Sequence, residues 1–69
     1  MQVNPSSLRV IRERSGLTVT ALARAAGIHQ AHLSNIEAGR RNPSPQVGRA
    51  LAAALKIDLV AILADPDAA

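Results

Sequence analysis

The sequence contains no phenylalanine, tyrosine or tryptophan, and no cysteine. Without aromatic rings it lacks the flat side chains on which RNA-binding sheets and single-strand grooves stack unpaired bases. Without cysteine it can form neither a disulfide framework nor a zinc ribbon, and it offers no thiol nucleophile. These absences weigh against modules that hold unpaired nucleic acid, and they exclude chemistry that depends on a thiolate.

Long apolar segments are also missing. No apolar run approaches the roughly 18 residues that a membrane-spanning helix needs. No basic stretch precedes an apolar segment with a small-residue cleavage site, which is how a secretory signal is recognised. We therefore expect a cytoplasmic protein with no membrane partner.

The apolar residues that are present favour helices. A chain of 69 residues holds one domain and buries only about 60% of its unfolded surface. Alanine accounts for 14 of the apolar residues, so the core must come from 18 leucines, isoleucines and valines. Because strands favour β-branched and aromatic side chains, this composition suits close-packed helices better than a sheet. We expect a single all-α domain over residues 1–69.

Positive charge is concentrated in the first part of the chain. All 8 basic residues lie within residues 1–56, where only Glu13 and Glu37 oppose them, so this part carries 8 − 2 = +6. Residues 57–69 carry three aspartates and no basic residue, or −3. A basic body of this kind favours a polyanionic partner.

Capping residues, glycines and prolines divide the chain into five expected short helices. They lie between a loose arm at residues 1–5 and an acidic tail at residues 65–69. Each expected helix carries apolar residues at helical spacing between a start signal and a stop signal. The helices are expected from Ser6 or Ser7 to just before Gly16, from the cap Thr18 to Ala26, from Gln30 to Ala38, from the start signal Ser44-Pro45 to Leu55 or Lys56, and from the cap Asp58 to just before Asp65.

The second and third helices are joined by very little chain. Two helices that cross at about 90–120° over a tight turn need a small residue at the crossing, which Ala23 supplies. The turn needs a residue that accepts positive φ, which Gly27 supplies. Ile28 can then fill the corner, and Leu33 and Ile36 can seat the third helix on the core.

Residues 19–38, VTALARAAGIHQAHLSNIEA, resemble the helix-turn-helix of phage repressor and Cro-type proteins, also called Xre-like. The resemblance extends to Arg12, the Leu17-Thr18 entry, residues 36–44, and the spaced Leu51, Leu55, Ile57 and Leu59. It implies a compact bundle of five short helices, the lambda-repressor-like DNA-binding domain, encoded by a bacterium or a phage. It also implies a transcriptional repressor that binds duplex DNA as a homodimer on an inverted repeat, with dimers that can form only on DNA.

The resemblance implies that the third helix reads base edges in the major groove. The outward residues expected to do so are Gln30, Ala31, Ser34 and Asn35. An amide such as that of Gln30 can pair bidentately with adenine, and the Ala31 methyl can meet a thymine methyl. The alternative is that these are ordinary solvated residues of a surface helix.

Other residues match family positions that face the DNA backbone. The expected phosphate contacts are Thr18, Arg24, His29, Arg40, Arg41 and Asn42. Arg12 and Glu37 match positions that commonly form an ion pair, which would orient the third helix. Arg9, Arg14 and Arg49 are expected to be solvated charges.

Four positions depart from the family pattern. Ala21 stands where the family has a glutamate three residues after the cap of the second helix, so the capping box is missing. Val19 stands where glutamine usually opens the second helix, so one phosphate contact is expected to be lost. His29 replaces the usual Ser or Thr cap of the third helix, and imidazole is expected to cap poorly and to contact phosphate instead. Gly48 replaces a core leucine, which marks either a close helix contact or a weak point.

Other functions fit the sequence less well. His29 and His32 lie three residues apart, but no cysteine and no carboxylate other than Glu37 accompanies them, so no metal site and no cofactor are expected. No glycine-rich phosphate loop, carboxylate pair or nucleophile–base set points to an enzyme. The remaining alternative is an antitoxin or adaptor that uses the same fold to bind a protein partner.

Overall fold

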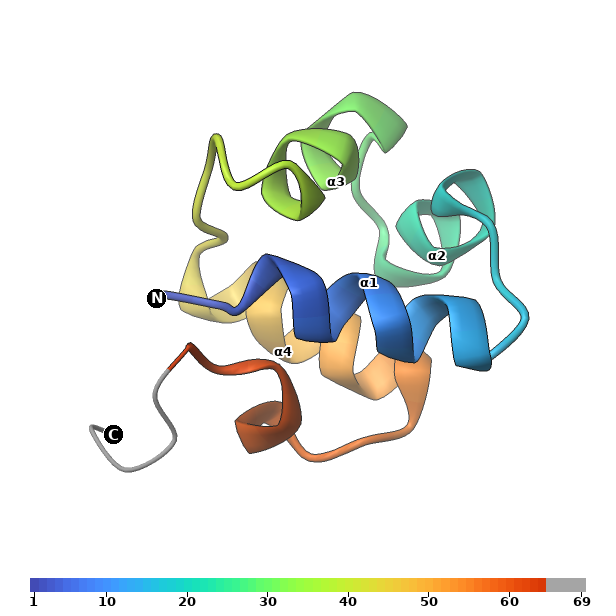
Figure 1. Ribbon diagram of the computed structural model, residues 1–69. Helices are drawn as coiled ribbons and strands as arrows, with labels where there is room; N and C mark the ends of the chain where they lie inside the picture. The colour runs from blue at the N-terminus through green and yellow to red at the C-terminus, as the bar shows by residue number, and fades with distance from the viewer. Residues whose placement is uncertain (65–69) are drawn as a thin grey trace.

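The computed structural model describes residues 1–64, and the expected acidic tail at 65–69 lies outside this part of the chain. Within it the chain forms α1 (Pro5–Arg14), α2 (Val19–Ala26), α3 (Gln30–Glu37), α4 (Pro45–Leu55) and the short 3-10 helix η1 (Leu59–Ile62). Figure 1 shows α3 at one edge of the bundle and η1 at the opposite edge, with α1 and α4 between them. The all-α class is confirmed. The expectation of five helices was slightly wrong, because the fifth segment is a single 3-10 turn.

Side-chain caps fix where three of the helices begin. The Thr18 hydroxyl accepts a hydrogen bond from the Ala21 amide at 3.0 Å, and the Ser44 hydroxyl accepts one from the Val47 amide at 3.2 Å. The first helix begins earlier than expected, because Asn4 caps it by accepting from the Ser7 amide at 3.1 Å. Pro5 then occupies the first helical position, where its missing N–H costs nothing.

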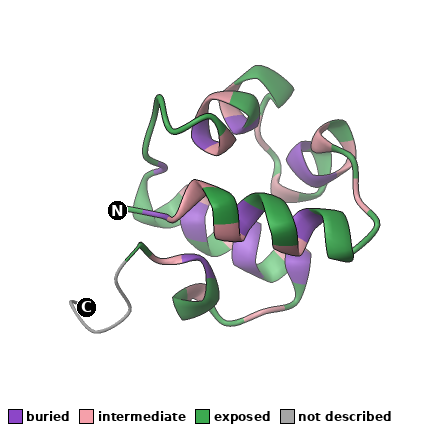
Figure 2. Cartoon of the chain, in the orientation of Figure 1, coloured by how far each residue is buried: buried purple, intermediate pink, exposed green. Residues whose placement is uncertain are grey.

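The core lies at the centre of the bundle and is made of aliphatic side chains. Figure 2 shows buried positions on the inward sides of the helices and exposed positions around them. The least exposed large side chains are Leu8, Leu22, Leu33, Ile36, Pro43, Leu51 and Ile62, which come from every helix and from the loop before α4. α2 packs against both α3 and α4, so it connects the outer helix to the rest of the core.

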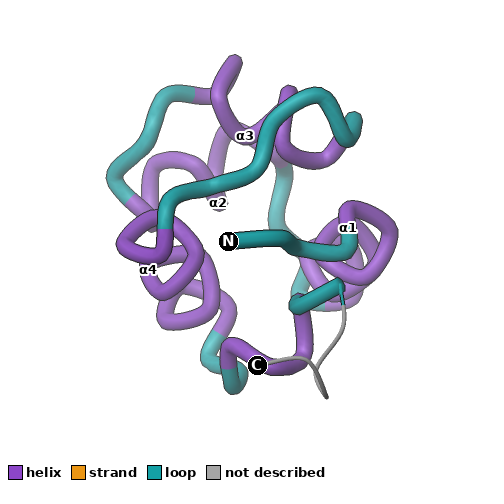
Figure 3. Tube along the Cα trace, turned by 90° about the vertical axis from the view of Figure 1, so that its left-hand side faces the viewer, coloured by secondary structure: helices purple, strands orange, loops and turns teal. Residues whose placement is uncertain are grey.

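The first residues of the chain are packed rather than loose, so the expected arm at residues 1–5 was wrong. Val3 is only 4% exposed and forms an antiparallel bridge with Leu63. The Asn4 amide donates to the Ile62 carbonyl at 2.8 Å, and the Ala64 amide donates to the Gln2 carbonyl at 3.2 Å. Figure 3 shows this stretch running between α4 and α1. We call the paired segments 2–4 and 62–64 the terminal clasp.

The first residue of the chain, just before the terminal clasp, explains the glycine in the middle of α4. Gly48 is buried, and a Cβ at this position would clash with the sulfur of Met1. A leucine here, as the family pattern has, would occupy the space that the first residue fills. Gly48 therefore marks a close contact with the first residue of the chain, not with another helix as one of the two expectations had it.

No helix in the described part of the chain is both long and apolar enough to cross a membrane. In that same part, no three His, Asp or Glu side chains gather where they could hold a metal ion.

Candidate nucleic-acid interface

The turn between α2 and α3 has the geometry that its sequence requires. Gly27 adopts φ +74°, the left-handed conformation that glycine accepts without strain. The Ile28 amide donates to the Ala23 carbonyl at 2.9 Å, which closes the end of α2. Ala23 is only 2% exposed, so the two helices approach closely at this small side chain. The turn thereby fixes how α3 is set against α2, and Figure 1 shows the two helices joined by this short connection.

α3 has one buried side and one exposed side. Leu33 and Ile36 are fully buried and anchor the helix to the core. Gln30, Ala31 and Ser34 are exposed, while Asn35 is half-buried at the edge of the exposed side. All four positions expected to read bases therefore lie on the accessible surface of one eight-residue helix. Their side chains offer two amides, one hydroxyl and one methyl group.

His29 caps α3 through its ring, so the expectation that it would contact phosphate instead of capping was wrong on the cap. Its Nδ1 accepts a hydrogen bond from the Ala31 amide at 3.1 Å. This bond requires a lone pair on Nδ1, which places the proton of the neutral ring on Nε2. His29 is exposed, so its Nε2–H is accessible from solvent. Capping at Nδ1 therefore leaves a donor on the other nitrogen.

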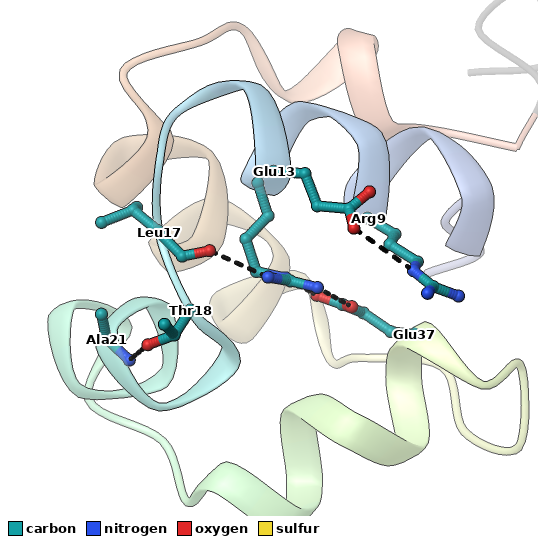
Figure 4. A network of polar contacts seen from close by, with 7 residues as sticks. Arg9, Glu13, Leu17, Thr18, Ala21 and Glu37 are labelled. Atoms are coloured by element: carbon teal, nitrogen blue, oxygen red, sulfur yellow. Dashed lines mark hydrogen bonds and ion pairs between the residues drawn. The ribbon is translucent and has the colours of Figure 1, made fainter.

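Arg12 and Glu37 lie in direct contact and join α1 to the end of α3. Arg12 Nε donates to Glu37 Oε2 at 2.8 Å, and Nη2 donates to Oε1 at 3.1 Å, which is the two-bond fork of an arginine–carboxylate pair. A third hydrogen bond of the guanidinium, from Nη1 to the Leu17 carbonyl at 2.8 Å, reaches the entry to α2. Figure 4 draws these contacts together.

The environment of Arg12 keeps its guanidinium charged. The side chains of Arg12 and Glu37 are only 11% and 8% exposed. The hydrogen bond with Glu37 raises the pKa of Arg12 above its ordinary value, although burial acts in the opposite direction. Arg12 is therefore cationic at any working pH, and Glu37 meets a permanent positive charge.

The residues after α3 form an exposed basic loop. The Arg40 and Arg41 amides donate to the Asn35 carbonyl at 3.0 and 3.3 Å, which ties the start of the loop to the helix. The side chains of Arg40, Arg41 and Asn42 are exposed, and Pro43 behind them is buried. Two guanidinium groups thus project from a loop whose ends are fixed.

The other two expected phosphate contacts lie on α2. Thr18 is exposed at the cap of this helix, and its hydroxyl still has a proton to donate after accepting from Ala21. Arg24 is exposed in the last turn of α2. The expected backbone-facing residues therefore come from α2, from the cap of α3 and from the loop after it.

A hollow of about 270 Å³ lies on the surface between α1 and α3, beside their contact. Its walls are formed by Arg9, Arg12, Val19, Ser34, Glu37 and Ala38. Ser34 belongs to the expected base-reading set, whereas Arg9 was expected to be a solvated charge. No sequence pattern indicates this neighbourhood, because it depends on how α1 packs beside α3.

The comparisons with known proteins agree with this geometry. Residues 6–63 match the model of a family described as a helix-turn-helix domain. The chain is similar to the restriction-modification controller protein C.AhdI from Aeromonas hydrophila, with 32% identity over 83% of this chain and 86% of that one, and a TM-score of 0.81. No curated protein matches it by sequence.

Two other solved structures are similar. An HTH_3 family transcriptional regulator from Vibrio cholerae has 29% identity and a TM-score of 0.81 over 93% of this chain, but only 36% of that longer protein is covered. The clp gene regulator ClgR from C. glutamicum has 29% identity and a TM-score of 0.75, over 80% of this chain and 71% of that one.

Proposed function

Since this chain belongs to the helix-turn-helix domain family, we propose that it is a transcriptional regulator that binds duplex DNA through α3. The major groove of B-DNA is wide enough for one helix, whose first residues meet the base edges. α3 is the helix whose exposed side is polar at its start and whose opposite side is anchored by Leu33 and Ile36. This combination is the observation that carries the proposal.

We assign base reading to the exposed side of α3. The amide of Gln30 pairs with adenine or bridges to a phosphate, and the amide of Asn35 and the hydroxyl of Ser34 bind further along the same groove. The Ala31 methyl contacts a thymine methyl. Reading of this kind requires a helix that does not shift, because a bidentate contact tolerates little displacement.

We assign phosphate binding to the groups around α3. Arg40, Arg41 and Asn42 contact one strand after the helix, while Thr18 and Arg24 contact the backbone from α2. His29 uses its Nε2–H for a phosphate while Nδ1 holds the cap. Contacts of this class fix the orientation of the protein but carry no direct sequence information.

Arg12 and Glu37 orient the reading helix in this scheme. The fork between them attaches the end of α3 to α1, and the bond from Arg12 to Leu17 attaches both to the entry of α2. Two independent links therefore hold α3: the tight turn at its start and the ion pair at its end.

We further propose that the protein binds an inverted repeat as a homodimer and acts as a repressor. Two copies related by a two-fold axis would place their reading helices in successive major grooves, about 34 Å apart. The charge of +6 over residues 1–56 supports attraction to duplex DNA, and affinity should therefore fall steeply with salt.

Selection of binding sites from random duplex DNA tests this proposal. The expected result is an enriched inverted repeat whose half-sites are about one helical turn apart. The double variant Gln30→Ala/Asn35→Ala should lose the sequence preference but keep weak, salt-sensitive binding. If no sequence is enriched and no duplex is bound at low salt, the proposal is wrong. The adaptor function would then be favoured.

A further inference from the structure

The hollow between α1 and α3 is a second place where charge faces the reading helix. Ser34 and Ala38 form its wall on the α3 side, and Arg9 forms its wall on the α1 side. Ser34 follows Gln30 by four residues, so the hollow lies one helical turn along from the start of the reading helix. A DNA strand that runs beside α3 at this edge would therefore pass the guanidinium of Arg9.

Arg9 is available for a ligand in a way that Arg12 is not. In the described part of the chain it pairs with Glu13, with Nε and Oε2 3.9 Å apart, and the two side chains are 65% and 55% exposed. An exposed pair at this separation contributes little stability and is easily exchanged. Arg12, by contrast, already donates three hydrogen bonds, two to Glu37 and one to the Leu17 carbonyl. Figure 4 shows Arg9 beside Glu37 at the α3 end of the network.

The other side chains of the hollow suit an anion more than a cation or an apolar group. Glu37 is the carboxylate among them, and its two oxygens already accept from Arg12. The side chains of Val19 and Ala38 are apolar, so they offer no competing side-chain acceptor. The free polar groups are therefore the Arg9 guanidinium and the Ser34 hydroxyl, both of which donate hydrogen bonds.

We propose that this hollow holds a backbone phosphate of duplex DNA, bound by Arg9 and by the Ser34 hydroxyl. In this refinement Ser34 donates to the phosphate in place of the base contact assigned to it above, and base reading stays with Gln30, Ala31 and Asn35. This assignment rests on the proposed DNA-binding function and adds a residue to it. When DNA binds, Arg9 exchanges Glu13 for the phosphate. The contact then holds the edge of α3 at a fixed depth in the groove, on the side that faces α1.

Arg14 provides a matched control on the same helix. It is exposed, carries the same charge, and does not line the hollow in the described part of the chain. Five residues separate it from Arg9, which places the two side chains about 140° apart around the helix axis. Both substitutions lower the net charge by one. A difference in DNA binding between the two variants therefore reflects the position of the charge and not the net charge.

The test compares Arg9→Gln, Arg14→Gln and the unaltered protein by fluorescence anisotropy over a series of salt concentrations. The probes are a duplex carrying the selected site and an unrelated duplex of equal length. We expect Arg9→Gln to weaken binding about fivefold at 0.1 M salt on both probes. It should also reduce the slope of log K against log salt by about 0.9, the value for one phosphate contact. Arg14→Gln should leave that slope unchanged.

The outcomes separate this proposal from the one on which it rests. If the unaltered protein binds duplex DNA but Arg9→Gln and Arg14→Gln give the same slope, the Arg9 site is wrong and the DNA-binding function stands. If the unaltered protein binds no duplex, both are wrong. Glu13→Gln gives an independent check, because it frees Arg9 and should strengthen binding. Weaker binding by this variant would contradict the exchange.

Discussion

At the scale of single residues, the guanidinium of Arg12 has more partners than any other side chain discussed above. It joins α1 to the last turn of α3 and to the entry of α2 through three hydrogen bonds. Both members of the ion pair are largely removed from water, so each depends on the other to offset its desolvation. Loss of one partner should therefore be worse than loss of both.

We predict that Glu37→Met lowers the free energy of unfolding by about 3 kcal/mol, because it leaves the Arg12 charge buried without its carboxylate. The double variant Arg12→Met/Glu37→Met should be more stable than Glu37→Met alone, since it removes the unpaired charge. Urea unfolding followed by circular dichroism measures both. Glu13→Gln, at an exposed pair, should cost less than about 0.5 kcal/mol. A double variant less stable than Glu37→Met would contradict this account.

His29 supports a second prediction at this scale. His29→Ala removes the acceptor that satisfies the Ala31 amide and should cost about 1 kcal/mol. His29→Asn keeps a side-chain acceptor and should be at least as stable as the unaltered protein, because asparagine is among the best caps. Thermal unfolding separates the two variants. Equal stability of the alanine and asparagine variants would show that the ring does not act as a cap.

At the scale of the elements, the sequence predicted what depends on local chemistry. Thr18 and the Ser44-Pro45 pair identified the starts of α2 and α4, and Gly27 identified the turn. Asn4 was missed as a cap because Ser6 and Ser7 offered equally good local signals. The nature of the last segment was missed as well, because nothing in its apolar spacing distinguishes one 3-10 turn from a short α-helix.

The same division applies to the candidate site. The positions of Arg12 and Glu37 came from the family pattern, and the structure places these two side chains in contact. The neighbourhood of Arg9 could not be predicted, because its spacing from Glu13 resembles an ordinary solvated pair on one helix. Only the packing of α1 beside α3 shows what else Arg9 faces.

The turn between α2 and α3 makes a prediction at this scale. A Cβ at Gly27 would meet no atom within 4 Å in the described residues, so Gly27→Ala suffers from its positive φ and not from a clash. We expect a loss of about 1–2 kcal/mol for Gly27→Ala. Gly27→Asn should lose less, because asparagine accepts this conformation more readily. Urea unfolding compares them, and an equal loss would indicate a steric cause.

At the scale of the whole molecule, the terminal clasp connects the beginning of the chain to its end. Val3 is buried in it, and the backbone bonds on either side hold it against Leu63 and Ile62. The small core therefore includes a residue that the sequence had assigned to a loose arm. Val3 should therefore contribute more to the free energy of unfolding than a residue so close to the chain end usually does.

We predict that Val3→Ala lowers the free energy of unfolding by about 2 kcal/mol, because it removes two buried methyl groups and leaves a small cavity. Val10→Ala is the matched control, since Val10 is 42% exposed on α1. It should cost much less. Denaturant unfolding measures both variants. A Val3→Ala variant as stable as the control would mean that the clasp is open in solution.

The clasp also has a consequence for the order of folding. Its hydrogen bonds join residues about 60 positions apart, so they close the longest loop in the described chain. Their formation therefore has the largest entropic cost of loop closure. The helix-turn-helix, by contrast, is built from contacts between neighbours in sequence. The clasp should therefore form late and open first, before the reading helix is disturbed. Hydrogen exchange would then be faster at the Asn4 and Ala64 amides than at the Ile28 amide.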